Sequence, residues 1–157
     1  MINWTLAHTG RALIASVLVA FGGAAAAQMT PVGQWHSIDD KTNELKSLII
    51  VKETGGVLTG HIEKLLRKDA DQKKLCTECS DDRKDKPVLG MEIIRGAKKV
   101  EGKDVWEDGK ILDPENGKSY TLRLTPIEDG KKLEVRGSVF GIGRTQIDHQ
   151  IAINLIQ

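Results

Sequence analysis

The strongest constraint on the fold is a period-two alternation of apolar and polar residues in short segments. The alternation runs through Val57–Leu66, Lys118–Thr125 and Leu133–Val139, while Leu45–Lys52 is apolar on both faces at its centre. Because successive side chains of a strand point to opposite faces, this period predicts β-strands, most with one buried face. Glycine-containing signals predict tight chain reversals between strands, at Thr54-Gly55-Gly56, Asp108-Gly109, Asn116-Gly117 and Asp129-Gly130.

Helix signals are scarce by comparison. Glu63–Asp71 supports at most a turn or two of helix, because its apolar stripe is thin. Many short strands joined by hairpin turns predict an all-β sandwich or barrel. We favour an antiparallel β-barrel over a sandwich, because closure removes exposed sheet edges and the interior Gly60 and Gly137 suit sharp bends at barrel corners.

The first 27 residues have the order of a secretory signal peptide. Met1–Arg11 carries one basic residue and no acid, Ala12–Phe21 is apolar or small, and Ala25-Ala26-Ala27 offers a cleavage site. A membrane anchor is the alternative, but the apolar run is short for a span of roughly 20 residues and no stop-transfer flank follows. We therefore expect export to the periplasm, and a mature chain of residues 28–157 that forms a single barrel domain.

The charge balance excludes some classes of partner. The chain has 23 Lys and Arg against 22 Asp and Glu, and removal of Met1–Ala27 takes away one basic residue, so the mature chain is near neutral. Nucleic-acid binding usually needs a basic face, so no nucleic-acid partner is expected. Strong attachment to an anionic membrane is not expected either, and no second apolar run is long enough for a stable membrane span.

Cys76 and Cys79 are the only cysteines, and in an exported protein such a pair is typical of a disulfide. A bridge this short would stabilise the loop locally rather than the whole fold. Three alternatives are weaker. A redox site expects a βαβ context, a c-type haem needs His where Ser80 stands, and zinc needs two further ligands at suitable spacing. We predict no metal and no cofactor.

The disulfide pair lies in Arg67–Lys86, a highly charged segment without strand periodicity. Charge runs are usually solvated loops. Long loops are also often functional, so this segment could instead form a lid over one end of the barrel.

Aromatic and arginine side chains are the candidate ligand contacts. We expect Trp35 to plug the closed end of the barrel, where Arg144 from the last strand could stack on its indole. Trp106, Tyr120 and Phe140 are candidate ligand-contact aromatics, although such residues are more often plain core. Arg136 and Arg144 are candidate anchors for an anionic group on a ligand.

Acidic residues in turns have mainly structural interpretations. Asp113, Pro114 and Gly117 fit a turn in which the carboxylate accepts backbone N–H groups and Gly117 takes a left-handed angle. Asp39-Asp40 could cap a turn or bind a cation. No established catalytic motif is present, and a His61, Asp113 and Ser119 triad has no support in the spacing. We assign no catalytic residue.

Taken in order, these motifs resemble a family of uncharacterised secreted bacterial proteins, domain of unknown function 2147. The likeness runs from Pro31 to about Gln146. This chain departs from the family pattern at Ile147-Asp148, where an aromatic residue is expected shortly after Gln146. The likeness rests on Gly33-Gln34-Trp35, Gly60, Cys76-x-x-Cys79 with Pro87 and Gly90, Gly109-Lys110-Ile111-Leu112-Asp113-Pro114 with Gly117 and Tyr120, Leu133-x-Val135-Arg136-Gly137, and Gly141-x-Gly143-Arg144-Thr145-Gln146.

The resemblance implies a lipocalin-like barrel and no known enzymatic activity. A barrel of about eight strands can hold one small ligand, so we expect a periplasmic protein that binds a small, largely apolar molecule. Candidate ligand-binding residues are Trp35, Trp106, Tyr120, Arg136 and Arg144. Two alternatives stay open. One is a scaffolding module of the cell envelope that presents the charged loop to an unknown protein partner, and the other is an enzyme of unknown chemistry.

Overall fold

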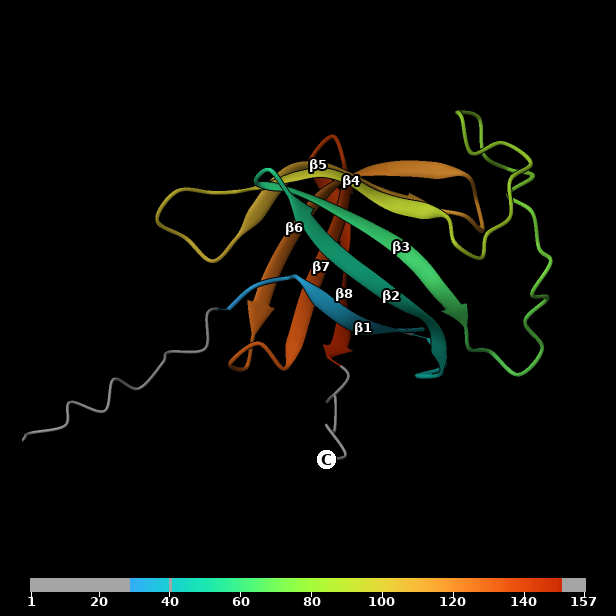
Figure 1. The fold of residues 1–157 in the computed structure, drawn as a ribbon, viewed down its shortest axis with the longest axis horizontal. Coiled ribbons are helices and arrows are strands. Elements are labelled where there is room, and N and C mark those ends of the chain that lie inside the picture. The colour runs from blue at the N-terminus through green and yellow to red at the C-terminus, as the bar shows by residue number, and fades with distance from the viewer. Residues whose placement is uncertain (1–28, 40, 151–157) are drawn as a thin grey trace, which may run out of the picture.

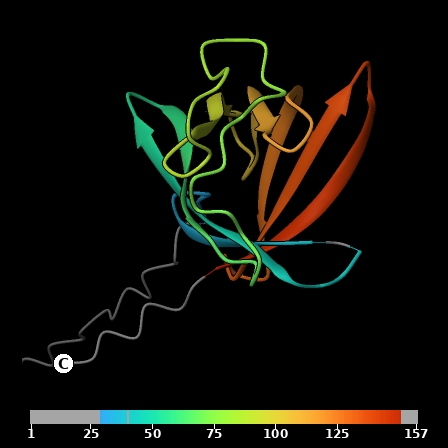
Figure 2. The ribbon, with the colours of Figure 1, turned by 90° about the vertical axis from the view of Figure 1, so that its right-hand side faces the viewer.

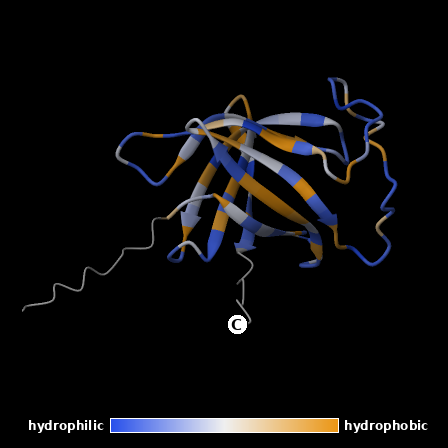
Figure 3. Cartoon of the chain, in the orientation of Figure 1, coloured by the Kyte–Doolittle hydropathy of each residue, from blue (hydrophilic) through white to orange (hydrophobic). Residues whose placement is uncertain are grey.

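The computed structural model describes residues 29–39 and 41–150. Within these residues the chain forms one closed antiparallel β-barrel (Figure 1). Figure 3 shows apolar and polar residues alternating along its strands, as the sequence predicts. The strands are β1 (Gly33–Ile38), β2 (Leu45–Thr54), β3 (Val57–Leu65), β4 (Glu92–Lys99), β5 (Trp106–Asp113), β6 (Lys118–Ile127), β7 (Lys132–Val139) and β8 (Ile142–Gln150).

Each strand pairs with the next along the chain, and β8 returns to β1 to close the barrel. The closing contacts place Trp35 opposite Gln150 and His36 opposite His149. These contacts join the first and last strands, so the sheet closes on itself. The predicted all-β barrel of about eight strands is confirmed. The predicted signal peptide, Met1–Ala27, lies outside the described residues, and within those residues no helix has the length and apolar character to cross a membrane.

The predicted reversal at Asp108-Gly109 is wrong, because both residues lie inside β5. Trp106 pairs with Leu124 and Gly109 with Leu122, so β5 carries an extra residue there and forms a β-bulge. Asp108 has φ 63°. An Asp-Gly pair supplies the unusual backbone geometry and close approach that a bulge needs, as it does for a hairpin turn. A Cβ on Gly109 would lie 2.7 Å from the Ala97 backbone nitrogen of β4.

Glu63–Asp71, where the sequence gives only a weak helix signal, contains no helix. Glu63, Lys64 and Leu65 continue β3, and the chain then enters the long segment that leads to β4. The strand persists because Leu65 pairs with Ser47 and Lys64 with Leu48 at the end of the β2–β3 ladder, and this pairing supplies the backbone hydrogen bonds. The other three predicted turns join consecutive strands as expected.

One end of the barrel is packed solid. The Trp35 side chain is fully buried there, and its Nε1 donates a hydrogen bond to the Pro31 carbonyl oxygen at 2.7 Å. This end carries the β2–β3, β4–β5 and β6–β7 turns. The largest fully buried side chains include Trp35, Val51, Leu58, Leu122, Leu124 and Leu133. Trp35 therefore closes the barrel at the end where the described chain enters it.

The opposite end carries the β1–β2, β3–β4, β5–β6 and β7–β8 connections. The β3–β4 segment, residues 66–91, lies beyond this end in Figure 1 and crosses in front of the barrel in Figure 2. The fold thus has a packed end and an end that only loops cover, and the candidate site lies at the second.

Candidate functional site

The barrel interior opens into a cavity of about 650 Å³ at the loop-covered end. Ligand pockets in proteins usually measure about 300–1,000 Å³ and have mainly apolar walls. The inner wall of this cavity is aliphatic, and polar and charged side chains gather toward its mouth. The aliphatic residues that line the cavity include Ile49, Ile62, Leu65, Val88, Ile93, Ile111, Leu112 and Val135.

Tyr120 and Arg144 are the two sequence-predicted ligand residues that line the cavity. Tyr120 lies on β6, and Gly137 of β7 leaves room for it, since a Cβ on Gly137 would lie 3.2 Å from the Cβ of Tyr120. Arg144 lies near the start of β8 and is exposed at the rim. The structure therefore brings one predicted aromatic and one predicted cation to the site.

The other predicted ligand residues lie elsewhere. Trp35 belongs to the packed end. Trp106 is buried in the core, with the Lys99 ammonium 5.2 Å from its ring centroid in a cation–π contact. The Arg136 side chain lies on the outer face of β7, whereas its neighbour Val135 lines the cavity. The Arg136 Nη1 donates a hydrogen bond to the Thr145 hydroxyl at 3.2 Å. None of these three lines the cavity.

The expected stacking of Arg144 on Trp35 is wrong. Arg144 pairs with Gly137 near the mouth, whereas Trp35 pairs with Gln150. Arg144 and Gln150 lie six positions apart on β8, which is roughly 20 Å along a strand. Strand register therefore puts the two side chains at opposite ends of the barrel. Phe140, another aromatic considered from the sequence, is fully exposed at the tip of the β7–β8 hairpin.

A buried polar group in the cavity wall was not predicted from the sequence. The Asp148 carboxyl on β8 is only 3% exposed, and Gln146 Nε2 donates to its Oδ1 at 2.6 Å. The same nitrogen donates to the Ser37 hydroxyl of β1 at 2.8 Å. Ser37 pairs with Ser47 of β2, which is also buried. All four residues line the cavity, and we call them the interior polar cluster.

Burial dominates the behaviour of Asp148. Desolvation raises the pKa of its carboxyl from 3.8 to about 6. Three interactions lower that pKa in part. They are the side-chain hydrogen bond from Gln146, the positive charge of Lys46 and a backbone hydrogen bond from Ile38. Two sequence features could have indicated this group. Gln146 and Asp148 are two positions apart, so their side chains lie on the same face of a strand. Asp148 also belongs to the stretch just after Gln146 where the family pattern has an aromatic residue.

Salt bridges cross the mouth of the cavity. Arg67, just after β3, binds Asp39 Oδ2 at 2.5 Å and Glu115 Oε1 at 3.0 Å. Glu115 lies in the β5–β6 turn and also approaches Lys46 Nζ at 3.5 Å. Because β1 and β5 are four strands apart in an eight-stranded barrel, Arg67 links opposite sides of the opening. We call these four side chains the mouth cluster.

Asp39 has a capping role in the loop after β1. Its Oδ1 accepts hydrogen bonds from the backbone N–H groups of Lys41 and Thr42, at 2.9 and 3.1 Å. These two bonds, followed by Arg67, lower the pKa of Asp39 to about 2 despite partial desolvation. The geometry matches the turn-capping alternative for the Asp39-Asp40 pair, and Asp40 lies outside the described residues.

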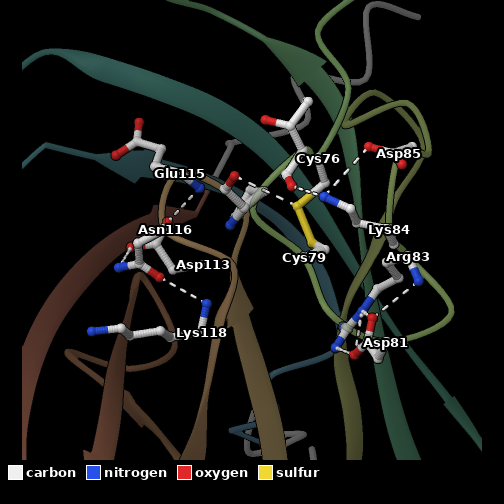
Figure 4. The surroundings of a disulfide bond; sticks show 12 residues. Cys76, Cys79, Asp81, Arg83, Lys84, Asp85, Asp113, Glu115, Asn116 and Lys118 are labelled. Atoms are coloured by element: carbon white, nitrogen blue, oxygen red, sulfur yellow. Dashed lines mark hydrogen bonds and ion pairs between the residues drawn. A yellow bond between two sulfur atoms is a disulfide. The ribbon is translucent and has the colours of Figure 1, made fainter.

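The predicted disulfide between Cys76 and Cys79 is confirmed, and both residues are buried. Figure 4 shows it next to the Asp113–Gly117 turn, where Cys76 Sγ lies 3.6 Å from the Pro114 carbonyl oxygen. In that turn Asp113 Oδ1 accepts the Glu115 N–H at 2.9 Å, and Gly117 has φ 68°. The charged loop is thus attached to the barrel through the turn.

Arg83 attaches the same loop to the barrel wall. Its guanidinium donates to the Glu92 carbonyl oxygen at 3.0 Å and to the Ser119 hydroxyl at 3.3 Å, and it pairs with Asp81. The side-chain hydrogen bond from Arg83 lowers the pKa of Asp81 to about 2. The loop is therefore held by built-in contacts along much of its length, while Asp69, Asp71 and Lys74 line the cavity mouth.

The residues of the hypothetical His61, Asp113 and Ser119 triad have separate partners. His61 Nε2 lies 3.9 Å from Glu92 Oε1, Asp113 serves its own turn, and Ser119 accepts from Arg83. The structure does not assemble a triad from them. Across residues 29–39 and 41–150, no group of three His, Cys, Asp or Glu side chains is arranged to hold a metal ion.

Comparison with known proteins agrees with this architecture. A solved structure, protein HP1028 from the human pathogen Helicobacter pylori, is described as belonging to the lipocalin family and superimposes with a TM-score of 0.67 at 18% identity, covering 78% of this chain and 83% of that chain. No curated protein sequence matches. The fold is thus lipocalin-like. Residues 33–149 match the family model described as an uncharacterized protein conserved in bacteria (DUF2147), and the chain belongs to that family.

Proposed function

We propose that this protein binds one small, largely apolar molecule in the barrel cavity. The observation that carries the proposal is the cavity of about 650 Å³ with its aliphatic inner wall. An eight-stranded barrel is just wide enough to hold one small ligand, as lipocalins do. The lipocalin-like fold supports this interpretation. No catalytic constellation among the described residues competes with it.

We further propose that the protein works in the periplasm. The signal-peptide pattern of Met1–Ala27 is the basis for this location. The Cys76–Cys79 disulfide supports it, because such bridges persist in oxidising compartments. Cell fractionation combined with N-terminal sequencing of the purified protein tests it. We expect periplasmic protein that begins at Gln28, and a cytoplasmic protein that retains Met1–Ala27 contradicts the proposal.

Binding is tested with the neutral fluorescent probe N-phenyl-1-naphthylamine and with two matched variants. Val135→Trp fills the cavity from β7, whereas Arg136→Trp places the same side chain on the outer face at the next position. We expect wild type and Arg136→Trp to take up the probe, and Val135→Trp to bind it at least tenfold more weakly. The proposal fails if native mass spectrometry finds the wild-type barrel always empty and the probe does not bind. It also fails if both variants bind the probe like the wild type.

A further inference from the structure

We infer that the bound molecule carries a polar end that donates hydrogen bonds, best a primary ammonium group, and that this end sits against the Asp148 carboxyl inside the cavity. This inference rests on the proposed function and specifies the chemistry of its ligand. It differs from the sequence-based hypothesis, in which Arg136 and Arg144 are candidate anchors for an anionic group on the ligand.

The geometry of the interior polar cluster supplies the first argument. Asp148 lines the cavity together with Ser37, Ser47 and Gln146, and the rest of the inner wall is mainly aliphatic. Within the described residues this carboxyl receives hydrogen bonds from the side-chain Nε2 of Gln146 and from the backbone N–H of Ile38. A carboxylate has room for about four hydrogen bonds. Acceptor capacity inside an apolar pocket is what a donor-bearing ligand would use.

The distribution of cations supplies the second argument. A buried carboxylate is stable only when it is paired or well hydrogen-bonded. Lys46 on β2 exerts a favourable charge effect on Asp148, yet its Nζ lies beside Glu115 at 3.5 Å. The raised pKa of Asp148, about 6, is what incomplete compensation produces. An ammonium group brought in by the ligand completes the pair.

The placement of the arginines argues against an anionic ligand. Arg136 lies on the outer face of β7, and Arg67 binds Asp39 and Glu115. Arg144 lines the cavity only at its exposed rim. A ligand anion deep in the pocket would face the Asp148 carboxyl, and repulsion between like charges would weaken its binding.

The pH dependence of ligand binding at Asp148 also depends on the charged groups of the elements around it. On β7 the residue paired with Asp148 is the apolar Leu133, and the charged β7 side chains face outward. On β8 itself His149 is exposed. The charged side chains that line the same cavity are Asp39 and Lys41 after β1, Lys46 on β2, Arg67, Asp69, Asp71 and Lys74 after β3, Asp113 and Glu115 at the β5–β6 turn, and Arg144 on β8.

The test compares three ten-carbon molecules that differ only in their polar end: decylammonium, 1-decanol and decyl sulfate. None of the three changes its charge between pH 5 and pH 7.5, so any pH dependence belongs to the protein. Each is titrated, below its micelle-forming concentration, into wild-type protein loaded with N-phenyl-1-naphthylamine. At pH 7.5 we expect decylammonium to bind about tenfold more tightly than decyl sulfate. At pH 5, where the Asp148 carboxyl is largely protonated, its advantage over 1-decanol should fall about fivefold to tenfold.

Asp148→Asn keeps the size and removes the charge. This variant should lose both the preference for decylammonium over decyl sulfate and the pH dependence of that preference, and its uptake of the neutral probe shows whether the cavity is still present. Glu134→Gln is the control, because this acid is on β7 beside Leu133 and faces outward. Its binding should match the wild type throughout.

The inference is overturned if the wild type binds decyl sulfate as tightly as decylammonium, or if Asp148→Asn keeps the ammonium preference. If Asp148→Asn fails to fold, the comparison of ligand binding by the wild type at pH 5 and pH 7.5 still tests the inference. A wild-type protein that takes up the neutral probe without ranking the polar ends refutes only this inference. A protein that takes up no probe refutes the proposed function with it.

Discussion

Gly117 packs against the backbone of Glu78 so closely that a Cβ built on the glycine would lie 1.9 Å from the Glu78 carbonyl oxygen. Glu78 is inside the ring closed by the disulfide, and Gly117 ends the turn that begins at Asp113. Two motifs that are about 40 residues apart in the sequence therefore form a single contact at the cavity mouth. This contact requires a residue without a side chain.

Replacing Gly117 with Ala should destabilise the protein by about 2–4 kcal/mol, because the methyl group collides with backbone and the φ of 68° disfavours any side chain. Gly130→Ala is the matched control. It has φ 79° with nothing within 4 Å, so it should lose only about 1 kcal/mol. Urea unfolding measures both variants. Equal losses would contradict the close contact.

Removing the disulfide should loosen the loop more than it destabilises the fold. A double variant, Cys76→Ala with Cys79→Ala, should lose about 2 kcal/mol of global stability, because the closed ring is short. Hydrogen exchange should accelerate at the backbone amides of positions 76 and 88, which donate to the carbonyl oxygens of Lys86 and Lys74. Amides of the β6–β7 ladder serve as the internal control. Unchanged exchange in the loop would contradict this prediction and would mean that contacts other than the disulfide, such as those of Arg83, hold the loop.

Wild-type stability should fall as the pH rises from about 4 to about 7. The raised pKa of Asp148 means that the folded state holds its proton more tightly than the unfolded state does, so stability is lost as the pH rises from the ordinary pKa of 3.8 through the folded-state pKa of about 6. Asp148→Asn lacks this effect. Its stability relative to the wild type should increase by about 1–1.5 kcal/mol between pH 5 and pH 7.5. Urea unfolding at the two pH values tests this, and a constant difference would contradict the burial argument.

Opening the mouth cluster should change binding kinetics more than stability. Arg67→Gln removes the contacts to Asp39 and Glu115, yet these side chains are partly exposed and the expected loss of stability is below about 1 kcal/mol. Stopped-flow measurements should show N-phenyl-1-naphthylamine entering several-fold faster. Lys132→Gln removes a comparable pair with Glu128 at the packed end and should leave the entry rate unchanged. An unchanged rate in Arg67→Gln would mean that the ligand enters elsewhere.

The alternation along β3, β6 and β7 was sufficient to predict strands and the side of each that is buried. Leu58, Leu122 and Leu133 are buried as expected, since the period of two is a local property of an extended backbone. The Cys76–Cys79 bridge was likewise predictable, because an even pair of cysteines behind a signal-peptide pattern is typical of a disulfide. The same local rules failed at Asp108-Gly109, since an Asp-Gly pair serves a bulge as well as a turn.

Register and barrel closure decided everything that depends on residues far apart in the chain. They separated Trp35 from Arg144, turned Arg136 outward, and gathered Ser37, Ser47, Gln146 and Asp148 in one cavity wall. The alternation of apolar and polar residues predicts that a side chain faces the barrel interior, but not whether it lies near the packed end or the open end. That position follows from how far each strand slides past its neighbours, which is set by the pairing of the whole barrel.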